Sequence, residues 1–443
     1  MRRYVIIGSG AAGIAAIEAI RSKDIQGEII LIAEDRHGYY SRPGLAYLLS
    51  REIPESGLFP FSKYDFTQLH VTWIGKRAVR INPATHRVYL HDGGTVPYDR
   101  LLIATGSRAV RLSIPGVDLE GSVKLDELED ARQIIKLSKR GKTAVVVGGG
   151  ITALEIVEGF IARGVKVHYF LRDDRYWKAV LEENESRIIE ERLRHEGVKI
   201  HYHTELVEIL GKRGRVVGVR TKKEEMIRCD IVAIAIGVKP RLEVASSSEV
   251  QTDRGIIVDD TLQTNIADIY AAGDVAQVYD SRSGKYVLDT LWSPARFQGQ
   301  NAGLNMAGYS QTFSKPISFN VTRLAGLTTT IIGSVGTGGR DMDMVGIARG
   351  DSESWRETPG FENDSLIESQ SDFDVNRIRL LLGNDTLVGA FIMGDQSLSN
   401  TLQKVILNQI NIASVRERLL KPGNSLSDTL LNIYHQWQRQ NAV

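Results

Sequence analysis

Two stretches of the chain repeat the same order of apolar runs and polar turns. The first has an apolar run at residues 4–7, the turn GSGAAG, small and apolar residues at helical spacing, and a second apolar run at 28–34. The second has a run at 143–147, a glycine turn, a helical pattern and a run at 165–171. Continuous apolar runs of this length are typical of buried parallel strands. The pattern therefore predicts a strand–helix–strand unit that occurs twice.

The rest of the chain has mainly β character until its C-terminal part. Residues 71–90 alternate apolar and polar positions, and residues 208–224 indicate a hairpin. From about residue 319 the pattern changes to strands followed by helical segments. Residues 336–372, rich in Gly, Asp, Glu and Ser, predict a long surface excursion. The expected fold class is α/β, with two Rossmann-like domains and an α+β C-terminal domain.

Composition narrows the partners and the compartment. Lys and Arg number 55 against 54 Asp and Glu, so no long-range field favours nucleic acid or an anionic membrane as a partner. The apolar runs are far shorter than the ~20 residues that cross a bilayer, which predicts a soluble, cytoplasmic protein. A length of 443 residues suggests about three domains. The single cysteine, Cys229, excludes an internal disulfide and a redox dithiol within one chain.

The first glycine turn carries a dinucleotide-binding fingerprint. Gly8 permits the tight turn after the strand, Gly10 lets the backbone approach a pyrophosphate, and Gly13 allows close packing of helix on strand. The positive end of the helix faces the phosphates. Glu34 ends the second strand about 20 residues further on, where a carboxylate accepts hydrogen bonds from a ribose diol. The other residues assigned to this site are Ala11, Ala12 and Asp35.

The second turn, GGGITALE, is a looser form of the same fingerprint. It keeps Gly148 and Gly150, with Ile151 opening the helix, and has Ala153 in the third place. The pattern admits that alanine because only the packing of helix on strand is at stake. The turn therefore predicts a second dinucleotide site.

The strand after this second helix ends on a base instead of an acid. Arg172, with Lys178 further along, could bind a 2′-phosphate through charge-assisted hydrogen bonds, which favours NADPH over NADH. The alternative is that LRDDR is a solvated loop, because its two aspartates partly cancel the charge. Both coenzymes therefore remain open.

With both fingerprints, the chain resembles the FAD-dependent pyridine nucleotide-disulfide reductase superfamily over roughly residues 1–335. Three further motifs carry the resemblance: ATGS at 104–107, AIGVKP at 235–240 and TNIADIYAAGDV at 264–275. It implies FAD at the first fingerprint and NADPH or NADH at the second. The chain would leave the FAD domain at the first of these motifs and return at the second.

The same resemblance implies three domains. Residues 1–112 and 247–318 would form a discontinuous FAD-binding domain, and residues 113–246 an inserted NAD(P)H-binding domain. Residues 319–443 would form a C-terminal interface domain with a helical tail. Because such domains commonly pair two subunits in the family, a homodimer is expected.

The resemblance also assigns cofactor contacts outside the fingerprints. Asp274 corresponds to the aspartate that binds the flavin ribityl chain, and a carboxylate beside a glycine turn can accept from a hydroxyl without adding bulk. Ala295 lies near the start of a helix that points at the flavin pyrimidine edge, where its dipole would stabilise negative charge. The remaining assigned residues are Val79, Ala104, Thr105, Gly106, Gly237 and Gly273.

The segment that holds redox cysteines in disulfide reductases has none in this chain. Its sequence YSRPGLAYLL instead resembles the YxRPxLSK segment of rubredoxin reductases, oxygenase-associated ferredoxin reductases and the FAD region of assimilatory nitrite reductases. Arg42 would then contact phosphate or flavin. The Ser-Lys of the motif is replaced by Ala46 and Tyr47. That lysine lies near flavin N5 in the relatives and pairs with a glutamate, here Glu155, so Tyr47 and Glu155 are the candidate catalytic residues.

The expected reaction is hydride transfer from nicotinamide C4 to flavin N5, followed by release of electrons to an external acceptor. A small rubredoxin- or ferredoxin-type iron–sulfur protein is the leading acceptor, because the chain lacks a dithiol and carries YSRP. An NAD(P)H oxidase or quinone reductase is one alternative. A non-catalytic subunit that FAD and NAD(P)H regulate is another. His201 and His203 alternate in a predicted strand without further ligand candidates, so no metal site is expected.

Overall fold

The computed structural model describes residues 1–335, 377–383, 385–420 and 426–441. It divides into two compact units. The first comprises Met1–Tyr176 and Glu190–Lys315, and the second comprises Trp177–Ile189 with the described residues beyond 315. The surface excursion expected at 336–372 lies outside the described residues. The three domain boundaries expected from the sequence stay a prediction.

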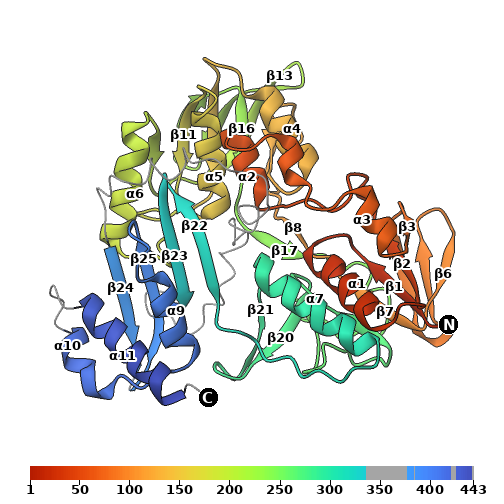
Figure 1. Cartoon of the computed structure of the whole chain (residues 1–443). Coiled ribbons are helices and arrows are strands. Elements are labelled where there is room, and N and C mark those ends of the chain that lie inside the picture. The colour runs from red at the N-terminus through yellow and green to blue at the C-terminus, as the bar shows by residue number, and fades with distance from the viewer. Residues whose placement is uncertain (336–376, 384, 421–425, 442–443) are drawn as a thin grey trace. The chain divides into compact units, whose positions relative to one another are not determined.

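The first fingerprint lies in a five-stranded parallel sheet of the first unit (Figure 1). The strand order is β19-β7-β1-β2-β3, where the strands are β1 (Arg3–Ile7), β2 (Glu28–Ile32), β3 (Val71–Ile74), β7 (Arg100–Ile103) and β19 (Ile269–Ala271). Helices α1 (Ala11–Lys23) and α7 (Trp292–Met306) pack closely together beside this sheet. A Cβ on Gly299 would lie 2.1 Å from the carbonyl oxygen of Ala12, so α7 can approach α1 only because that position is a glycine.

The second fingerprint lies in another five-stranded parallel sheet of the same unit. The order is β12-β11-β10-β16-β9, where the strands are β9 (Ser122–Val123), β10 (Thr143–Val147), β11 (Lys166–Phe170), β12 (Lys199–His201) and β16 (Ile231–Ile234). Helix α5 (Ile151–Ile161) follows β10, α4 (Leu128–Leu137) precedes it, and α6 (Glu183–His195) begins in the second unit and ends in the first. The predicted repeat of one strand–helix–strand unit is therefore confirmed.

Two short strands join these sheets. They are β8 (Ser107–Ala109), which follows β7, and β17 (Val238–Pro240), which follows β16, and they pair antiparallel. The hairpin predicted at 208–224 is confirmed by β13 (Leu206–Lys212) and β14 (Arg215–Thr221), with β15 (Met226–Arg228) beside it. The other elements of this unit are α2 (Gly44–Ser50), α3 (Lys63–Gln68), β4 (Ala78–Asn82), β5 (Arg87–Leu90), β6 (Thr95–Pro97), β18 (Ile256–Ile257), β20 (Ala276–Asp280) and β21 (Lys285–Leu288).

The second unit contains an antiparallel sheet with helices packed on it, as expected for an α+β region. The strand order is β22-β23-β25-β24, where the strands are β22 (Phe319–Leu324), β23 (Leu327–Gly333), β24 (Arg377–Leu382) and β25 (Leu387–Met393). The helices are α9 (Ser399–Leu407), α10 (Arg416–Leu420) and α11 (Leu426–Asn441). Arg379 of β24 forms an ion pair at 3.0 Å with Glu185, whose side chain is fully buried. This pair fixes part of Trp177–Ile189 to the sheet.

Two further expectations can be compared with the described residues. The strand predicted to carry both His201 and His203 ends at His201, because His203 has a φ of +49°, which a strand residue does not adopt. His201 instead meets His168 of β11, with 2.9 Å between their ring nitrogens. In the described part of the chain, no helix has the length and apolar character needed to cross a membrane.

Candidate functional site

A cavity of about 1020 Å³ opens at the carboxyl ends of the strands in the first sheet. Its wall includes the turns that follow β1, β2, β7 and β19. Ligands of open α/β sheets bind at this edge, where the turns from neighbouring strands converge. Most residues predicted for the first site lie on the cavity wall. These are Gly8, Gly10, Ala11, Ala12, Glu34, Asp35, Arg42, Val79, Ala104, Thr105, Gly106, Gly273, Asp274 and Ala295.

The glycines of the first turn are used differently. Gly8 has a φ of +115°, and a Cβ there would lie 2.2 Å from the carbonyl oxygen of Ala104. Gly13 lies behind the cavity wall, where a Cβ would lie 2.0 Å from the carbonyl oxygen of Gly8. Around Gly10, which precedes α1, a Cβ would meet nothing within 4 Å. The backbone at Gly10 is therefore open to a ligand at the N-terminus of α1, where anionic groups are favoured.

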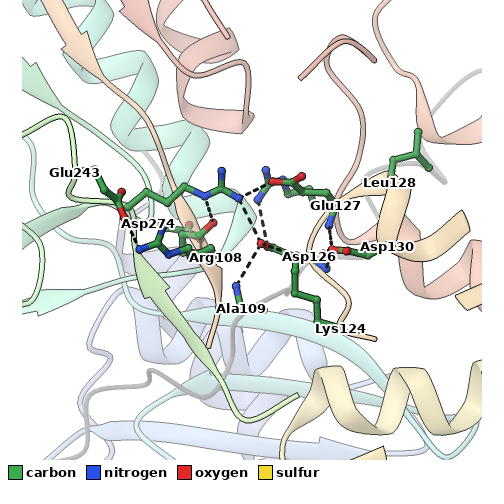
Figure 2. Close-up of polar contacts among 12 residues, drawn as sticks. Arg108, Ala109, Lys124, Asp126, Glu127, Leu128, Asp130, Glu243 and Asp274 are labelled. Atoms are coloured by element: carbon green, nitrogen blue, oxygen red, sulfur yellow. Dashed lines mark hydrogen bonds and ion pairs between the residues drawn. The ribbon is translucent and has the colours of Figure 1, made fainter. Parts of the chain in front are cut away.

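Asp274 belongs to a hydrogen-bonded network where the chain passes between the two sheets (Figure 2). Its Oδ2 accepts a hydrogen bond from Ser107 Oγ at 2.6 Å. Arg241, which follows β17, donates from Nε to the carbonyl oxygen of Ser107 at 3.1 Å. Its Nη2 donates to Glu127 at 2.5 Å and to Asp126 at 3.3 Å. The orientation of Asp274 therefore depends on residues from both crossings.

Asp126 is the most buried member of this network, with a side chain that is 3% exposed. It lies 3.7 Å from Arg42 Nη1 and 3.7 Å from Lys124 Nζ, and it accepts a hydrogen bond from the Ala109 amide at 3.3 Å. Figure 2 shows Asp126 beside Ala109 and Lys124, with Glu127 and Asp130 nearby. A buried carboxylate requires such partners, because desolvation without them would be costly. Asp126 thus holds Arg42 on the cavity wall.

Tyr40 also lines the cavity, two residues before Arg42. Its hydroxyl oxygen accepts a hydrogen bond from the Leu128 amide at 3.1 Å. Burial raises the pKa of Tyr40 to about 12, so the hydroxyl stays protonated at neutral pH. The side chain can therefore donate a hydrogen bond as well as accept one.

Thr290, Trp292 and Ala295 contribute one polar and two apolar side chains to the cavity wall. Thr290 lies on the wall, and its buried Oγ1 makes no hydrogen bond to any residue that the structure describes. Trp292 and Ala295, from the first turn of α7, lie beside it on the wall. A buried hydroxyl without a partner is costly unless a ligand or water satisfies it. Together with the open backbone at Gly10, these residues fit FAD.

Comparison with known proteins identifies the family. A family model described as "Pyridine nucleotide-disulphide oxidoreductase" matches residues 2–299. The chain belongs to this family. FAD and a nicotinamide coenzyme, both expected from the sequence, are the cofactors of the pyridine nucleotide-disulphide oxidoreductases, and the expected oxidoreductase class is confirmed.

Individual members of the family resemble most of the chain. Rubredoxin-NAD(+) reductase of Pseudomonas putida is 28% identical over 371 residues, which cover 83% of this chain and 94% of that protein. The 3-phenylpropionate/cinnamic acid dioxygenase ferredoxin--NAD(+) reductase component of Photorhabdus laumondii is 27% identical and covers 93% of this chain and 98% of its own length. The solved covalent putidaredoxin reductase–putidaredoxin complex has a TM-score of 0.81 at 20% identity, with 98% of this chain and 99% of that chain covered. That likeness concerns the fold alone.

The residues predicted for the coenzyme site do not lie on the wall of this cavity. Gly148 has a φ of +145°, and Gly150 is the N-cap of α5. Arg172 follows β11 and is exposed, whereas Lys178 is exposed in the segment assigned to the second unit. The others are Ile151 and Ala153 in α5, both buried, and Gly237, which has a φ of +114°. The N-terminus of α5 thus follows a glycine with positive φ, as that of α1 does, and the coenzyme site stays a prediction.

The two candidate catalytic residues of this family member lie on helices that pack together. Tyr47 is in α2 and is 6% exposed, and Glu155 is in α5. Helices α2 and α5 are in direct contact. The structure thus brings the two helices together, although the residues come from segments more than a hundred positions apart.

Sequence reasoning missed several residues of the site. Ser107 was recognised only as part of a motif, and Asp126, Arg241 and Thr290 were not recognised. Arg241 directly follows AIGVKP, so its position beside a crossing strand was a usable signal. No local pattern marks Asp126 or Thr290, since each meets the cavity only through the folding of distant segments.

Proposed function

We propose that this member of the family is an FAD-dependent oxidoreductase that takes a hydride from NADH or NADPH and passes electrons to a small iron–sulfur protein of the rubredoxin or ferredoxin type. Bound FAD supplies the hydride acceptor at N5 and can release electrons one at a time. The observation that carries the proposal is a cavity of about 1020 Å³, lined by the first fingerprint, Asp274 and Thr290, in a chain with a single cysteine. Cys229 is buried outside the cavity wall, so the electrons have no dithiol route within one chain.

The residues of the cavity would hold the flavin through complementary contacts. Asp274, oriented by Ser107, would accept a hydrogen bond from a ribityl hydroxyl. The buried Thr290 hydroxyl would form a hydrogen bond with the polar edge of the flavin ring system. The N-terminus of α1 at Gly10 would bind the pyrophosphate, and Glu34 would bind the ribose diol.

The coenzyme would bind at the second fingerprint, with its pyrophosphate at the N-terminus of α5. Arg172 supports NADPH, whereas the names of the two relatives refer to NAD(+). Comparing kcat/KM for both coenzymes in wild type and Arg172→Ala decides between them. A selective loss with NADPH is expected, and an unchanged preference would refute the role of Arg172.

Tyr47 and Glu155 are the proposed catalytic residues. Hydride transfer needs close stacking of the two rings more than it needs an acid or a base. Tyr47 is buried at the position of the family's lysine and would exclude water from the ring contact. Glu155, from the first turns of α5, would face the same region from the coenzyme side.

The names of the relatives and the missing dithiol support the proposed acceptor. Of the two relatives named above, one is named a rubredoxin reductase and the other a dioxygenase ferredoxin reductase component. The remaining parts of the proposal are a homodimer formed through residues 319–443, a cytoplasmic location, and the three domains with the boundaries given above.

The deciding experiment is anaerobic mixing of the purified flavoprotein with NADH or NADPH while the flavin absorbance is followed. Bleaching is expected, followed by rapid reoxidation when oxidised rubredoxin or ferredoxin is added. No bleaching with either coenzyme would refute the enzymatic proposal. Bleaching that is reversed by oxygen or a quinone, and not by either iron–sulfur protein, would refute the proposed acceptor.

A further inference from the structure

Two helices of the first unit, α2 beside the flavin cavity and α5 at the coenzyme fingerprint, pack against each other. Helix α2 begins directly after Arg42 and Pro43, which lie on the cavity wall, and it carries Tyr47. Helix α5 begins at Gly150 of the second fingerprint. The packing of α2 against α5 therefore joins the flavin cavity to the coenzyme fingerprint.

An arginine from the coenzyme side holds the C-terminal end of α2. Arg163, just beyond α5, donates from Nε to the carbonyl oxygen of Leu49 at 2.9 Å and from Nη2 to that of Leu48 at 3.0 Å. Carbonyl groups in the last turn of a helix lack partners within the helix, and the negative end of the helix dipole favours a cation there. The planar guanidinium binds both carbonyls at once, so it fixes the direction of α2 as well as its position.

A second, independent feature fixes the separation of the two helices. Gly159 of α5 lies against α2, and a Cβ at this position would be 2.7 Å from Leu49 Cβ. Leu49 is fully buried at this contact. The two helices thus touch at a distance that only a glycine permits, about one helical turn before Arg163.

We propose that Arg163 is a positioning residue for hydride transfer, because it holds α2 against α5 and so sets the distance between the flavin and the nicotinamide ring. This inference rests on the proposed function. Hydride transfer requires reacting atoms about 3–3.5 Å apart, and a displacement of about 1 Å can cost about 100-fold in rate. A small movement of α2 would therefore slow the reaction while both cofactors still bind.

The test measures flavin reduction by stopped flow, under anaerobic conditions, over a range of NADH and NADPH concentrations. The variants are Arg163→Ala, Arg163→Lys and Gly159→Ala, and the control is Arg215→Ala, which removes an exposed ion pair with Glu120. The limiting rate reports hydride transfer, its concentration dependence reports coenzyme Kd, and the amplitude reports bound FAD.

We expect Arg163→Ala to lower the limiting rate about 10- to 100-fold, with coenzyme Kd and FAD content changed by less than about 2-fold. Arg163→Lys should recover part of the rate, because it keeps the charge but loses the planar fork. Gly159→Ala should also slow the reaction, because the added methyl group separates the helices. Arg215→Ala should react like wild type.

A wild-type limiting rate in Arg163→Ala would overturn the inference while leaving the proposed function intact. A loss of amplitude with an unchanged rate per bound flavin would also overturn it, since that is the result of a purely structural role. Should Arg163→Ala fail to fold, Arg163→Lys and Gly159→Ala decide the matter. Failure of the wild type itself to bleach would refute the proposed function, and this inference with it.

Discussion

The substitution Thr290→Val should have opposite effects on the empty protein and on flavin binding. Thr290 Oγ1 is buried at the cavity wall and makes no hydrogen bond to a described residue. Valine has nearly the same shape but no hydroxyl. The empty variant is therefore relieved of an unsatisfied polar group, whereas the flavin-bound variant loses a contact that the proposed function requires.

The magnitude follows from the cost of the unsatisfied hydroxyl. Leaving a buried polar group without a partner costs about 1–3 kcal/mol, and the ligand would remove this cost when it binds. Since 1.4 kcal/mol corresponds to a factor of ten, the dissociation constant of FAD should rise about 5- to 150-fold in the variant. The melting temperature of the flavin-free protein should rise or stay the same.

The assay is titration of flavin-free protein with FAD, combined with thermal unfolding of the same preparations. Thr221→Val is the matched control, because Thr221 is 1% exposed and its Oγ1 accepts a hydrogen bond from the Glu225 amide at 3.2 Å. This control should lower the melting temperature and leave FAD affinity unchanged. If Thr290→Val binds FAD as wild type does, then the Thr290 hydroxyl does not contact the flavin. If it destabilises the flavin-free protein, then the hydroxyl already has a partner there and the premise of the prediction is wrong.

Three further predictions concern stability and reactivity. Arg379→Met should destabilise the second unit by up to about 3 kcal/mol, because it removes the nearer of two arginine partners of the buried Glu185 carboxylate and leaves Arg377 Nε at 3.4 Å; Glu185→Gln in the same chain should restore part of this in thermal unfolding, and an unchanged melting profile would contradict it. Gly299→Ala should lower both FAD content and melting temperature, since its Cβ would meet the Ala12 carbonyl oxygen at 2.1 Å; a normal FAD content would show that the helices can shift. Burial raises the pKa of Cys229 to about 12, so the thiol should resist iodoacetamide at pH 8 until the protein unfolds, and mass spectrometry of the native protein would detect the contrary.

Much of the first site could be predicted because its signals are local. The spacing of Gly8, Gly10 and Gly13 is set by one turn and the first turns of one helix: a side chain at Gly8 or Gly13 would meet backbone, and Gly10 leaves the backbone open. Glu34 and Asp274 follow apolar strands, and the ends of parallel strands meet at one edge of a sheet. A short stretch of sequence therefore determines both the conformation of each turn and its place in the fold.

The network behind Asp274 could not be predicted in the same way. Asp126 reads as one acid among several in LDELED, and nothing in that segment indicates that it will lie between Arg42 and Arg241. Its burial depends on two crossing strands, β8 and β17, that meet only in the folded chain. Thr290 is similar, since its missing partner becomes visible only when the surrounding backbone is in place.

The repeated unit extends further than the glycine turns from which it was predicted. In the first sheet, a Cβ on Gly8 would lie 2.2 Å from the carbonyl oxygen of Ala104, and in the second a Cβ on Gly148 would lie 2.1 Å from that of Ala235. Ala104 follows β7, which pairs with β1, and Ala235 follows β16, which pairs with β10. The two alanines lie in the related sequences IATG (103–106) and IAIG (234–237). The backbone around the first glycine is thus the same at both sites.

The identity of the ligand must consequently be determined by side chains outside this shared backbone. Glu34 lies just after the second strand of the first strand–helix–strand repeat, and Arg172 lies at the same place in the second repeat. These two side chains have opposite charge. An exchange of charge at that position should therefore alter ribose recognition without disturbing the turn. Because the turn conformation does not depend on those side chains, the proposed binding of two different dinucleotides is compatible with one backbone fold at both fingerprints.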